Sequence, residues 1–229
     1  MKKLLLLHGA LGTSITMEPL GERLNDEFEV FTFDFSGHGG APFATAFGIE
    51  SFTLEVLDFL DESGLETVDI FGYSMGGYVA LNLARQRPER VGKIITLATK
   101  FDWTPESAER ESKMLNSEKI EAKIPVFADL LRERHAPNDW KVLLQKTAEM
   151  MLELGQRPTL TPEILSQIQH PSLICLGDGD QMVSLVETTQ ATEALPNGQL
   201  RVLAQTPHPL EKVNLDALAV VIRAFLLAD

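Results

Sequence analysis

The sequence has very little cysteine. Cys175 is the single cysteine among 229 residues, so no disulfide can form within the chain. It lies inside the apolar run at residues 173–176, which favours a buried small side chain over a reactive thiol. Without a disulfide framework, a cytoplasmic location is the simplest prediction.

Positive charge and long hydrophobic runs are also scarce. The chain carries 20 Lys and Arg residues against 33 Asp and Glu, a formal net charge of −13. Such a chain repels polyanions, so we do not expect nucleic acid as a partner. No stretch approaches the ~18–20 apolar residues of a membrane span. The apolar run after Lys2 and Lys3 breaks at His8, short of the ~7–15 residues of a secretory signal, so we expect no cleaved leader.

Short apolar segments alternate with segments of helical period through the first part of the chain. The apolar segments cover residues 3–7, 28–34, 68–71 and 91–97, and the helical ones 17–25, 49–63 and 75–86. Strands that are apolar on both sides and separated by helices are typical of a parallel sheet covered on both faces. The sequence therefore predicts an α/β fold.

The pattern changes at residues 103–169, where helical spacing continues without a strand-like run. Thr104-Pro105 and Thr161-Pro162 each read as an N-cap followed by proline at the first helical position. Asn138 is the expected cap of a further helix. Alternation of strand and helix resumes at residue 172. We therefore predict an α/β core at 1–102 and 170–229, interrupted by a helical insertion at 103–169.

The strongest local motif is Gly72-Tyr73-Ser74-Met75-Gly76, which fits the pattern G-x-S-x-G. A predicted strand leads into it and a predicted helix leaves it, so the sharp turn would expose the Ser74 hydroxyl above the sheet. Glycines are needed where a Cβ would collide with neighbouring backbone. The helix N-terminus supplies N–H groups that favour a developing negative charge. Ser74 is therefore the predicted nucleophile.

A glycine-rich loop, His8-Gly9-Ala10-Leu11-Gly12, follows the first predicted strand. Such a loop can bring a backbone N–H towards the nucleophile. We expect the amides of Ala10 and Met75 to form an oxyanion hole. His8 itself is expected to shape the loop.

Four blocks of the sequence together resemble the α/β-hydrolase superfamily, in the small-cap branch that includes esterases and C–C bond hydrolases. They are residues 8–12, Asp34-Phe35-Ser36-Gly37-His38-Gly39, residues 72–77, and Gly177-Asp178-Gly179-Asp180-Gln181-Met182-Val183. The resemblance implies a mostly parallel sheet of about six strands, because the antiparallel hairpin that often precedes the first parallel strand is missing. It also implies that residues 103–169 form a helical cap over the site.

The resemblance further implies the chain order nucleophile, acid, histidine. Asp180 fills the position of the acid, with Asp178 and Asp102 as alternatives. His208 is the histidine that follows Asp180, and it would be the base. Its flanking prolines differ from the commoner family pattern.

We expect Leu11, Trp103, Phe127 and Trp140 to contact the substrate. The methionines of the insertion suit an adaptable apolar pocket, although helices also need an apolar face simply to pack. His135 and His170, in or beside the insertion, are expected to be solvated. No His, Cys, Asp and Glu cluster has metal-ligand spacing, so we expect no metal and no cofactor.

The predicted function is hydrolysis of a small ester or thioester, a small-molecule substrate, through an acyl-enzyme. His208 would take the proton of Ser74 during attack, and Asp180 would orient the imidazole. Two alternatives remain open. The same three residues could act as a base in a C–C bond hydrolase or a lyase like the menaquinone-pathway synthase, or the chain could be a ligand-sensing receptor.

Overall fold

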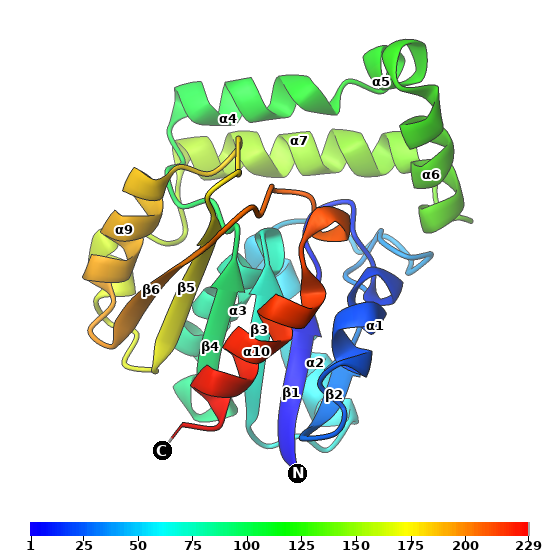
Figure 1. Ribbon diagram of the computed structural model, residues 1–229. Coiled ribbons are helices and arrows are strands. Elements are labelled where there is room, and N and C mark those ends of the chain that lie inside the picture. Colours follow the sequence, from blue (N-terminus) through cyan, green and yellow to red (C-terminus); the bar gives the residue numbers. More distant parts are fainter. Residues whose placement is uncertain (229) are drawn as a thin grey trace.

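A six-stranded parallel sheet forms the centre of the protein (Figure 1). The structure is a computed structural model that describes residues 1–228. The strands are β1 (Lys2–Leu7), β2 (Phe28–Thr32), β3 (Val68–Tyr73), β4 (Val91–Leu97), β5 (Ser172–Gly177) and β6 (Gly198–Leu203). They lie in the order β2-β1-β3-β4-β5-β6, and each neighbouring pair is parallel. The prediction of a parallel sheet of about six strands is confirmed.

Helices cover both faces of this sheet (Figure 1). On one face α1 (Ser14–Glu22) and α10 (Leu215–Leu226) bury their apolar sides. The other face carries α2 (Ile49–Glu62), α3 (Met75–Gln86) and α9 (Leu185–Ala194). Short 3-10 turns lie at Pro88–Arg90, Lys113–Leu115 and Leu210–Lys212.

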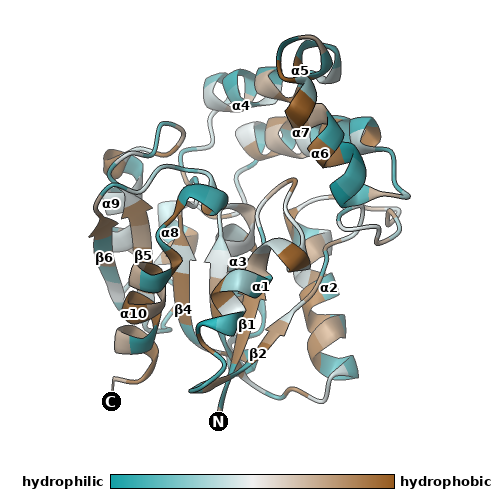
Figure 2. Cartoon of the chain, turned by 45° about the vertical axis from the view of Figure 1, so that its right-hand side comes forward, coloured by the Kyte–Doolittle hydropathy of each residue, from teal (hydrophilic) through white to brown (hydrophobic). Residues whose placement is uncertain are grey.

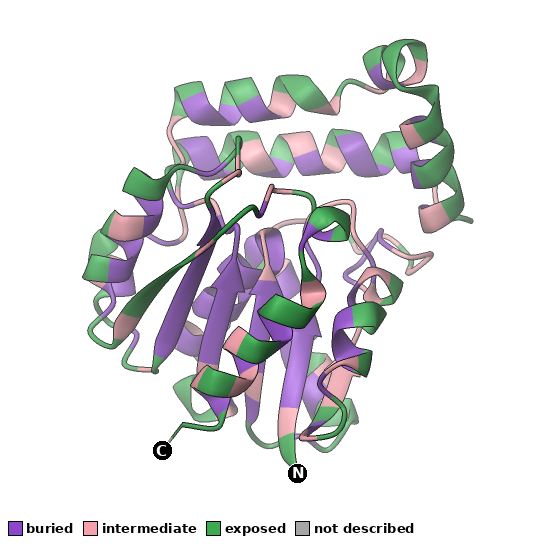
Figure 3. Cartoon of the chain, viewed as in Figure 1, coloured by how far each residue is buried: buried purple, intermediate pink, exposed green. Residues whose placement is uncertain are grey.

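The leucines of β1 show why the strands are apolar on both sides. Leu4 and Leu6 belong to the apolar cluster under α1 and α10, whereas Leu5 and Leu7 belong to the cluster under α2 and α3. Successive side chains of a strand point to opposite faces of the sheet. Because both faces are covered, the central strands are mostly buried, whereas most residues of the edge strand β6 are exposed (Figure 3). The same strands form the hydrophobic centre in Figure 2.

A layer of helices lies above the carboxyl ends of the strands (Figure 1). It consists of α4 (Pro105–Ser112), α5 (Ser117–Lys123), α6 (Pro125–His135) and α7 (Trp140–Gln156), and α4 lies against α7. The short helix α8 (Pro162–Leu165) leads back to the sheet. Within residues 1–228, none of the helices combines the length and apolar character needed to cross a bilayer.

The helix caps agree with the sequence at two positions and differ at a third. Thr104 caps α4 and Thr161 caps α8, each followed by proline. The cap of α7 is Asp139, whose side chain accepts from the Lys141 amide at 2.8 Å. The prediction of Asn138 was wrong because its side-chain amide instead donates to backbone carbonyls of the loop that follows β2.

Candidate functional site

Ser74 occupies the turn between a strand and a helix. β3 ends at Tyr73 and α3 begins at Met75, which leaves Ser74 with φ +51° and ψ −116°. Such a conformation is strained for a residue with a side chain, and the surrounding structure must hold it. The Ser74 amide donates to the Leu97 carbonyl at 2.8 Å. The Ser74 carbonyl accepts from Thr99 Oγ1 at 2.9 Å, so β4 and the loop after it fix the turn.

Two glycines beside Ser74 are required by close backbone contacts. A Cβ on Gly72 would lie 2.4 Å from the backbone of Gly77. A Cβ on Gly76 would lie 2.4 Å from the carbonyl oxygen of Leu7, at the end of β1. Helix α3 therefore begins in direct contact with both the motif and the first strand.

The loop after β1 packs against Ser74. A Cβ on Gly9 would lie 2.8 Å from the Tyr73 ring and 3.1 Å from the Ser74 Cβ. Ala10, Ser74 and Met75 line the same cavity. Across residues 1–228, no acceptor takes a hydrogen bond from the amide of Ala10 or of Met75. Both amides are thus available to an oxygen atom of a ligand.

His208 and Asp180 form a hydrogen-bonded pair. His208 Nδ1 lies 2.8 Å from Asp180 Oδ2, and the Asp180 side chain is 1% exposed. Burial alone would raise the pKa of Asp180. The hydrogen bonds from His208 and from the amides of Val183 and Met182 outweigh it and hold this pKa below its usual value. An ionised carboxylate only accepts, so His208 Nδ1 carries a proton, and in the neutral imidazole Nε2 is the acceptor.

The other two candidate carboxylates have different surroundings. Asp178 Oδ1 accepts from the Thr206 amide at 3.3 Å, which braces the loop. Asp102 is exposed, and its backbone carbonyl accepts from Ser107. Among the described residues, Asp180 is therefore the carboxylate that partners His208.

Tyr73 links the His208 loop to the Ser74 turn. Its hydroxyl donates to the His208 carbonyl at 2.7 Å, and the two ring centroids are 5.7 Å apart. Within residues 1–228, Ser74 Oγ makes no hydrogen bond to His208. Such bonds are often long before substrate binds. Sequence reasoning missed Tyr73, because the second position of the motif carries no chemical requirement.

The Asp180 and His208 loops also meet through backbone. A Cβ on Gly177, the last residue of β5, would lie 1.9 Å from the carbonyl oxygen of Thr206. Thr206 precedes the His208 loop, so the absence of a side chain at Gly177 permits the approach of the two loops that makes the pair.

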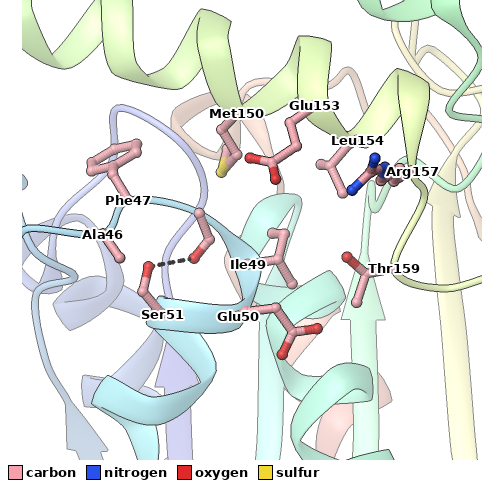
Figure 4. A pocket seen from close by; sticks show the side chains of 11 residues that line it. Ala46, Phe47, Ile49, Glu50, Ser51, Met150, Glu153, Leu154, Arg157 and Thr159 are labelled. Carbon is pink, nitrogen blue, oxygen red and sulfur yellow. Dashed lines mark hydrogen bonds between the residues drawn. The ribbon is translucent and has the colours of Figure 1, made fainter.

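The cavity beside Ser74 is small and largely apolar. Its volume is about 50 Å³. Helix α7 contributes Met150, Met151 and Leu154 to its wall, and Trp103, which the sequence predicts to contact the substrate, also lines this cavity. A larger cavity of about 350 Å³ lies next to it, between α7 and the start of α2 (Figure 4). The two cavities share three lining residues, Ile49, Met150 and Leu154.

Leu11, Phe127 and Trp140 do not line the Ser74 cavity in the part of the chain that the structure describes. Trp140 is 3% exposed and belongs to a separate cluster with Ile120, Ala128, Leu131 and Leu144, against which Leu11 and Phe127 pack. Their expected substrate contacts stay predictions, and the structure shows these side chains in helix packing. Helices α5, α6 and α7 use these side chains to pack on one another.

Leu11 instead ties the loop after β1 to the helical layer. Its backbone is left-handed, with φ +60°. Its carbonyl oxygen accepts from Arg134 Nη1 at 2.9 Å and from His135 Nε2 at 3.2 Å. The adjacent residue is Ala10, so helix α6 helps to position the loop that lines the cavity.

His135 was expected to be solvated, and that prediction was wrong. Its side chain is fully buried. Both ring nitrogens have partners there: Nδ1 accepts from the Gly39 amide at 3.2 Å, and Nε2 donates to the Leu11 carbonyl. His8 is also buried; its Nε2 accepts from the Phe35 amide at 3.3 Å. Both imidazoles therefore act as neutral bridges between backbone segments.

Because of these buried histidines, the free energy of unfolding depends on pH in the mildly acidic range. Burial lowers the pKa of His8 and of His135 to about 4, and nearby Arg134 contributes to the shift at His135. In the unfolded chain both titrate near ~6.5. The unfolded state therefore binds more protons between pH 6.5 and 4, so the free energy of unfolding falls as the pH drops through this range.

We expect the variant His135→Gln to lose less stability in acid than the wild type. Glutamine offers one acceptor and one donor without titrating. Between pH 6.5 and 4, the wild type should lose about 3 kcal/mol more of its free energy of unfolding than the variant does. Urea unfolding at several pH values measures this difference. Parallel pH curves for the two proteins would contradict this account.

Other polar groups offer no metal site in the described chain. Across residues 1–228, no group of three or more His, Cys, Asp and Glu side chains comes together in a way that could hold a metal ion.

Cys175 is buried, and burial raises the pKa of its thiol to about 12. The thiol therefore stays protonated and packs as a small apolar side chain, as predicted.

Comparisons with known proteins agree with this architecture. A family model described as alpha/beta hydrolase fold matches residues 2–118. The chain is 25% identical to a poly(3-hydroxyalkanoate) depolymerase of Ectopseudomonas oleovorans, over 97% of this chain and 83% of that protein. Over 99 residues it is 36% identical to a pimeloyl-[acyl-carrier protein] methyl ester esterase of Neisseria meningitidis serogroup A, a match that covers 43% of this chain and 30% of that protein.

A solved structure shares the whole fold. A thermophilic esterase from Thermogutta terrifontis superposes with a TM-score of 0.79, over 99% of this chain and 90% of that one. The sequences are 22% identical, so the likeness shows a common fold.

Proposed function

The chain belongs to the α/β-hydrolase family, and from this premise we propose that it is a serine hydrolase that cleaves a small ester or thioester through an acyl-enzyme. The observation that carries the proposal is the hydrogen-bonded pair of His208 and Asp180, tied through Tyr73 to the strained Ser74 turn. A base, its orienting acid and a hydroxyl in a cavity wall on a rigid turn are the parts that nucleophilic catalysis needs.

In the proposed first half-reaction, Ser74 Oγ attacks the carbonyl carbon of the substrate. His208 Nε2 takes the hydroxyl proton, and the Asp180 carboxylate stabilises the resulting imidazolium. The free amides of Ala10 and Met75 bind the oxyanion of the tetrahedral intermediate. The intermediate then collapses, and the leaving alcohol or thiol takes the proton from His208.

In the proposed second half-reaction, water attacks the acyl carbon of the Ser74 ester. His208 Nε2 takes a proton from the water, and a second tetrahedral intermediate forms at the same two amides. Its collapse breaks the bond to Ser74 Oγ, which regains a proton from His208. The carboxylic acid product is released.

We propose that residues 103–169 act as a cap on a core made of 1–102 and 170–228. Helix α7 closes the Ser74 cavity with Met150, Met151 and Leu154. Ligand sites for drug-sized molecules usually span ~300–1,000 Å³, and the cavity of about 50 Å³ is much smaller. A short acyl group is the expected fit.

The test is a series of p-nitrophenyl esters from acetate to decanoate, followed in the pre-steady state and by mass spectrometry. We expect the highest kcat/KM at the short end, a burst of p-nitrophenolate close to one equivalent, and an acyl group on the peptide that contains Ser74. A burst marks an accumulating acyl-enzyme. A fluorophosphonate probe should label the same serine.

Other results would favour the alternatives. Turnover without a covalent adduct would contradict the acyl-enzyme and favour a mechanism in which Ser74 and His208 act as a base on a carbon skeleton. Neither turnover nor labelling would contradict catalysis and favour a ligand-sensing role.

A further inference from the structure

Lys100 places a nearly buried cation in the wall of the Ser74 cavity. It lies in the loop after β4, and its side chain is 10% exposed. Ser74, Met75 and Trp103 line the same cavity. Among the residues described, Lys100 is the cavity-lining residue with a charged side chain; the others are apolar apart from Ser74 and Tyr78.

The ammonium group of Lys100 lacks close partners. Nζ lies 3.7 Å from Glu187 Oε2, which is longer than a hydrogen bond. It lies 5.7 Å from the centroid of the Trp103 ring. In the described chain, none of its three N–H donors makes a hydrogen bond to another residue. Within residues 1–228, Nζ is not among the buried side-chain atoms that lack a hydrogen-bond partner, so it keeps some contact with solvent and its donors are open to an anion.

Glu187 does not satisfy this cation fully. Its Oε2 is shared with the Ser184 hydroxyl at 3.2 Å, and its Oε1 is buried without a hydrogen-bond partner among the described residues. Burial raises the pKa of Glu187, so the environment disfavours its charged form. The pair therefore leaves Lys100 able to bind a further anion.

The larger neighbouring cavity does not favour an anion, because carboxylates outnumber cations in its wall. Arg157 lines it, but so do Glu50 and Glu153 (Figure 4). The excess of carboxylates there, like the net charge of −13, repels anions. An anionic group is favoured at Lys100 and disfavoured at the adjoining cavity.

We propose that Lys100 determines specificity by binding a carboxylate at the far end of a short acyl group. The preferred substrates would be monoesters or thioesters of short dicarboxylic acids. This inference rests on the proposed function and specifies its substrate class. The carboxylate would complete the hydrogen bonds of Nζ, while the methylene groups between the two carbonyl carbons contact Met150, Met151 and Leu154.

The test compares monomethyl glutarate, which is an anion, with dimethyl glutarate, which is neutral and has the same acyl length. We expect the wild type to favour the anion about 10- to 100-fold in kcat/KM, as for a hydrogen bond to a charged group. Lys100→Met should lose that preference, chiefly through a higher KM for the monomethyl ester. Equal kcat/KM values for both esters in the wild type would overturn the proposal.

Lys146→Met is the matched control. Lys146 also lies over aromatic rings, those of Phe43 and Phe47, but it does not line the Ser74 cavity. Its removal should leave the ratio of the two esters unchanged. The double variant Lys100→Met/Glu187→Gln removes the carboxylate that Lys100→Met would leave unpaired. If this double variant regains the preference for the anion, Lys100 is structural and the proposal is wrong.

A binding measurement separates this inference from the proposed function. Glutarate and neutral glutaramide are titrated calorimetrically into the wild type and Lys100→Met. If the wild type hydrolyses neither these esters nor the p-nitrophenyl series but binds glutarate about 10-fold more tightly than the variant does, the anion site stands and the hydrolase proposal fails. If both proteins bind glutarate equally, the inference about Lys100 fails whatever the enzyme hydrolyses.

Discussion

Replacing Ser74 with alanine is expected to lower kcat/KM for short p-nitrophenyl esters by at least about 10³-fold, because the proposed covalent nucleophile is lost while the cavity keeps its shape. Residual hydrolysis should come from the amides of Ala10 and Met75 and from binding alone. Initial rates at saturating and limiting ester measure both kcat and KM. A variant that keeps more than about a tenth of the activity would exclude Ser74 as the nucleophile.

A second variant at this position separates catalysis from backbone strain. Ser74→Ala keeps a side chain at φ +51°, whereas Ser74→Gly adopts that conformation freely. We expect the glycine variant to be inactive and yet more stable than the alanine variant by about 1 kcal/mol. Thermal unfolding should show this as a rise of about 2–4 °C. Equal melting temperatures would mean that the turn stores no strain.

Replacing Gly177 with alanine is expected to have the largest effect on stability. The new Cβ would meet the Thr206 carbonyl oxygen at 1.9 Å, and backbone cannot rotate away as a side chain can. Overpacking of this kind costs about 3 kcal/mol or more, which corresponds to a fall of about 6–12 °C in melting temperature. Displacing Thr206 also displaces His208 from Asp180, so kcat should fall about 10- to 100-fold.

Gly48→Ala is the control for this substitution. A Cβ on Gly48 would have its nearest contact at 3.9 Å, with Met150 Cγ. Its backbone is extended, with φ +161°, so the added side chain meets neither a collision nor strain. We expect its melting temperature to stay close to the wild type. A Gly177→Ala protein as stable as Gly48→Ala would show that the two loops are not in close contact.

Much of the fold could be predicted because it depends on local pattern. Strand β4 and helix α3 have the bounds that the sequence predicted, since the helix stops before Pro88 and the strand is an unbroken apolar run. The two-sided burial of β1 follows from the same reasoning. Local patterns also placed Thr104 and Thr161 at helix starts.

The parts that could not be predicted depend on contacts between distant segments. His135 bonds to Gly39 and Leu11, which are 96 and 124 positions away, so its burial has no local signal. The apolar spacing of α6 and α7 shows that each helix has a packing face, but the face alone does not tell which element covers it. Phe127 and Trp140 were therefore assigned to substrate and lie between helices.

Lys100 was missed for a related reason. A lysine in a loop after a strand usually reads as a solvated side chain. Its burial depends on Glu187 in α9 and on Trp103 at the start of the helical layer. The candidate nucleophile, acid and base carry motif signals, whereas Lys100 lies in no motif.

The hydrogen bonds from Arg134 and His135 to the Leu11 carbonyl bear on how such enzymes can be recombined. Through them, the helical layer supports the backbone of the loop that contains Ala10. A chimera that took residues 103–169 from a relative would lose the support of a left-handed residue in that loop, unless the donor segment brought equivalent side chains. Substrate range and catalytic rate would then change together, so the helical layer cannot be exchanged as an independent module.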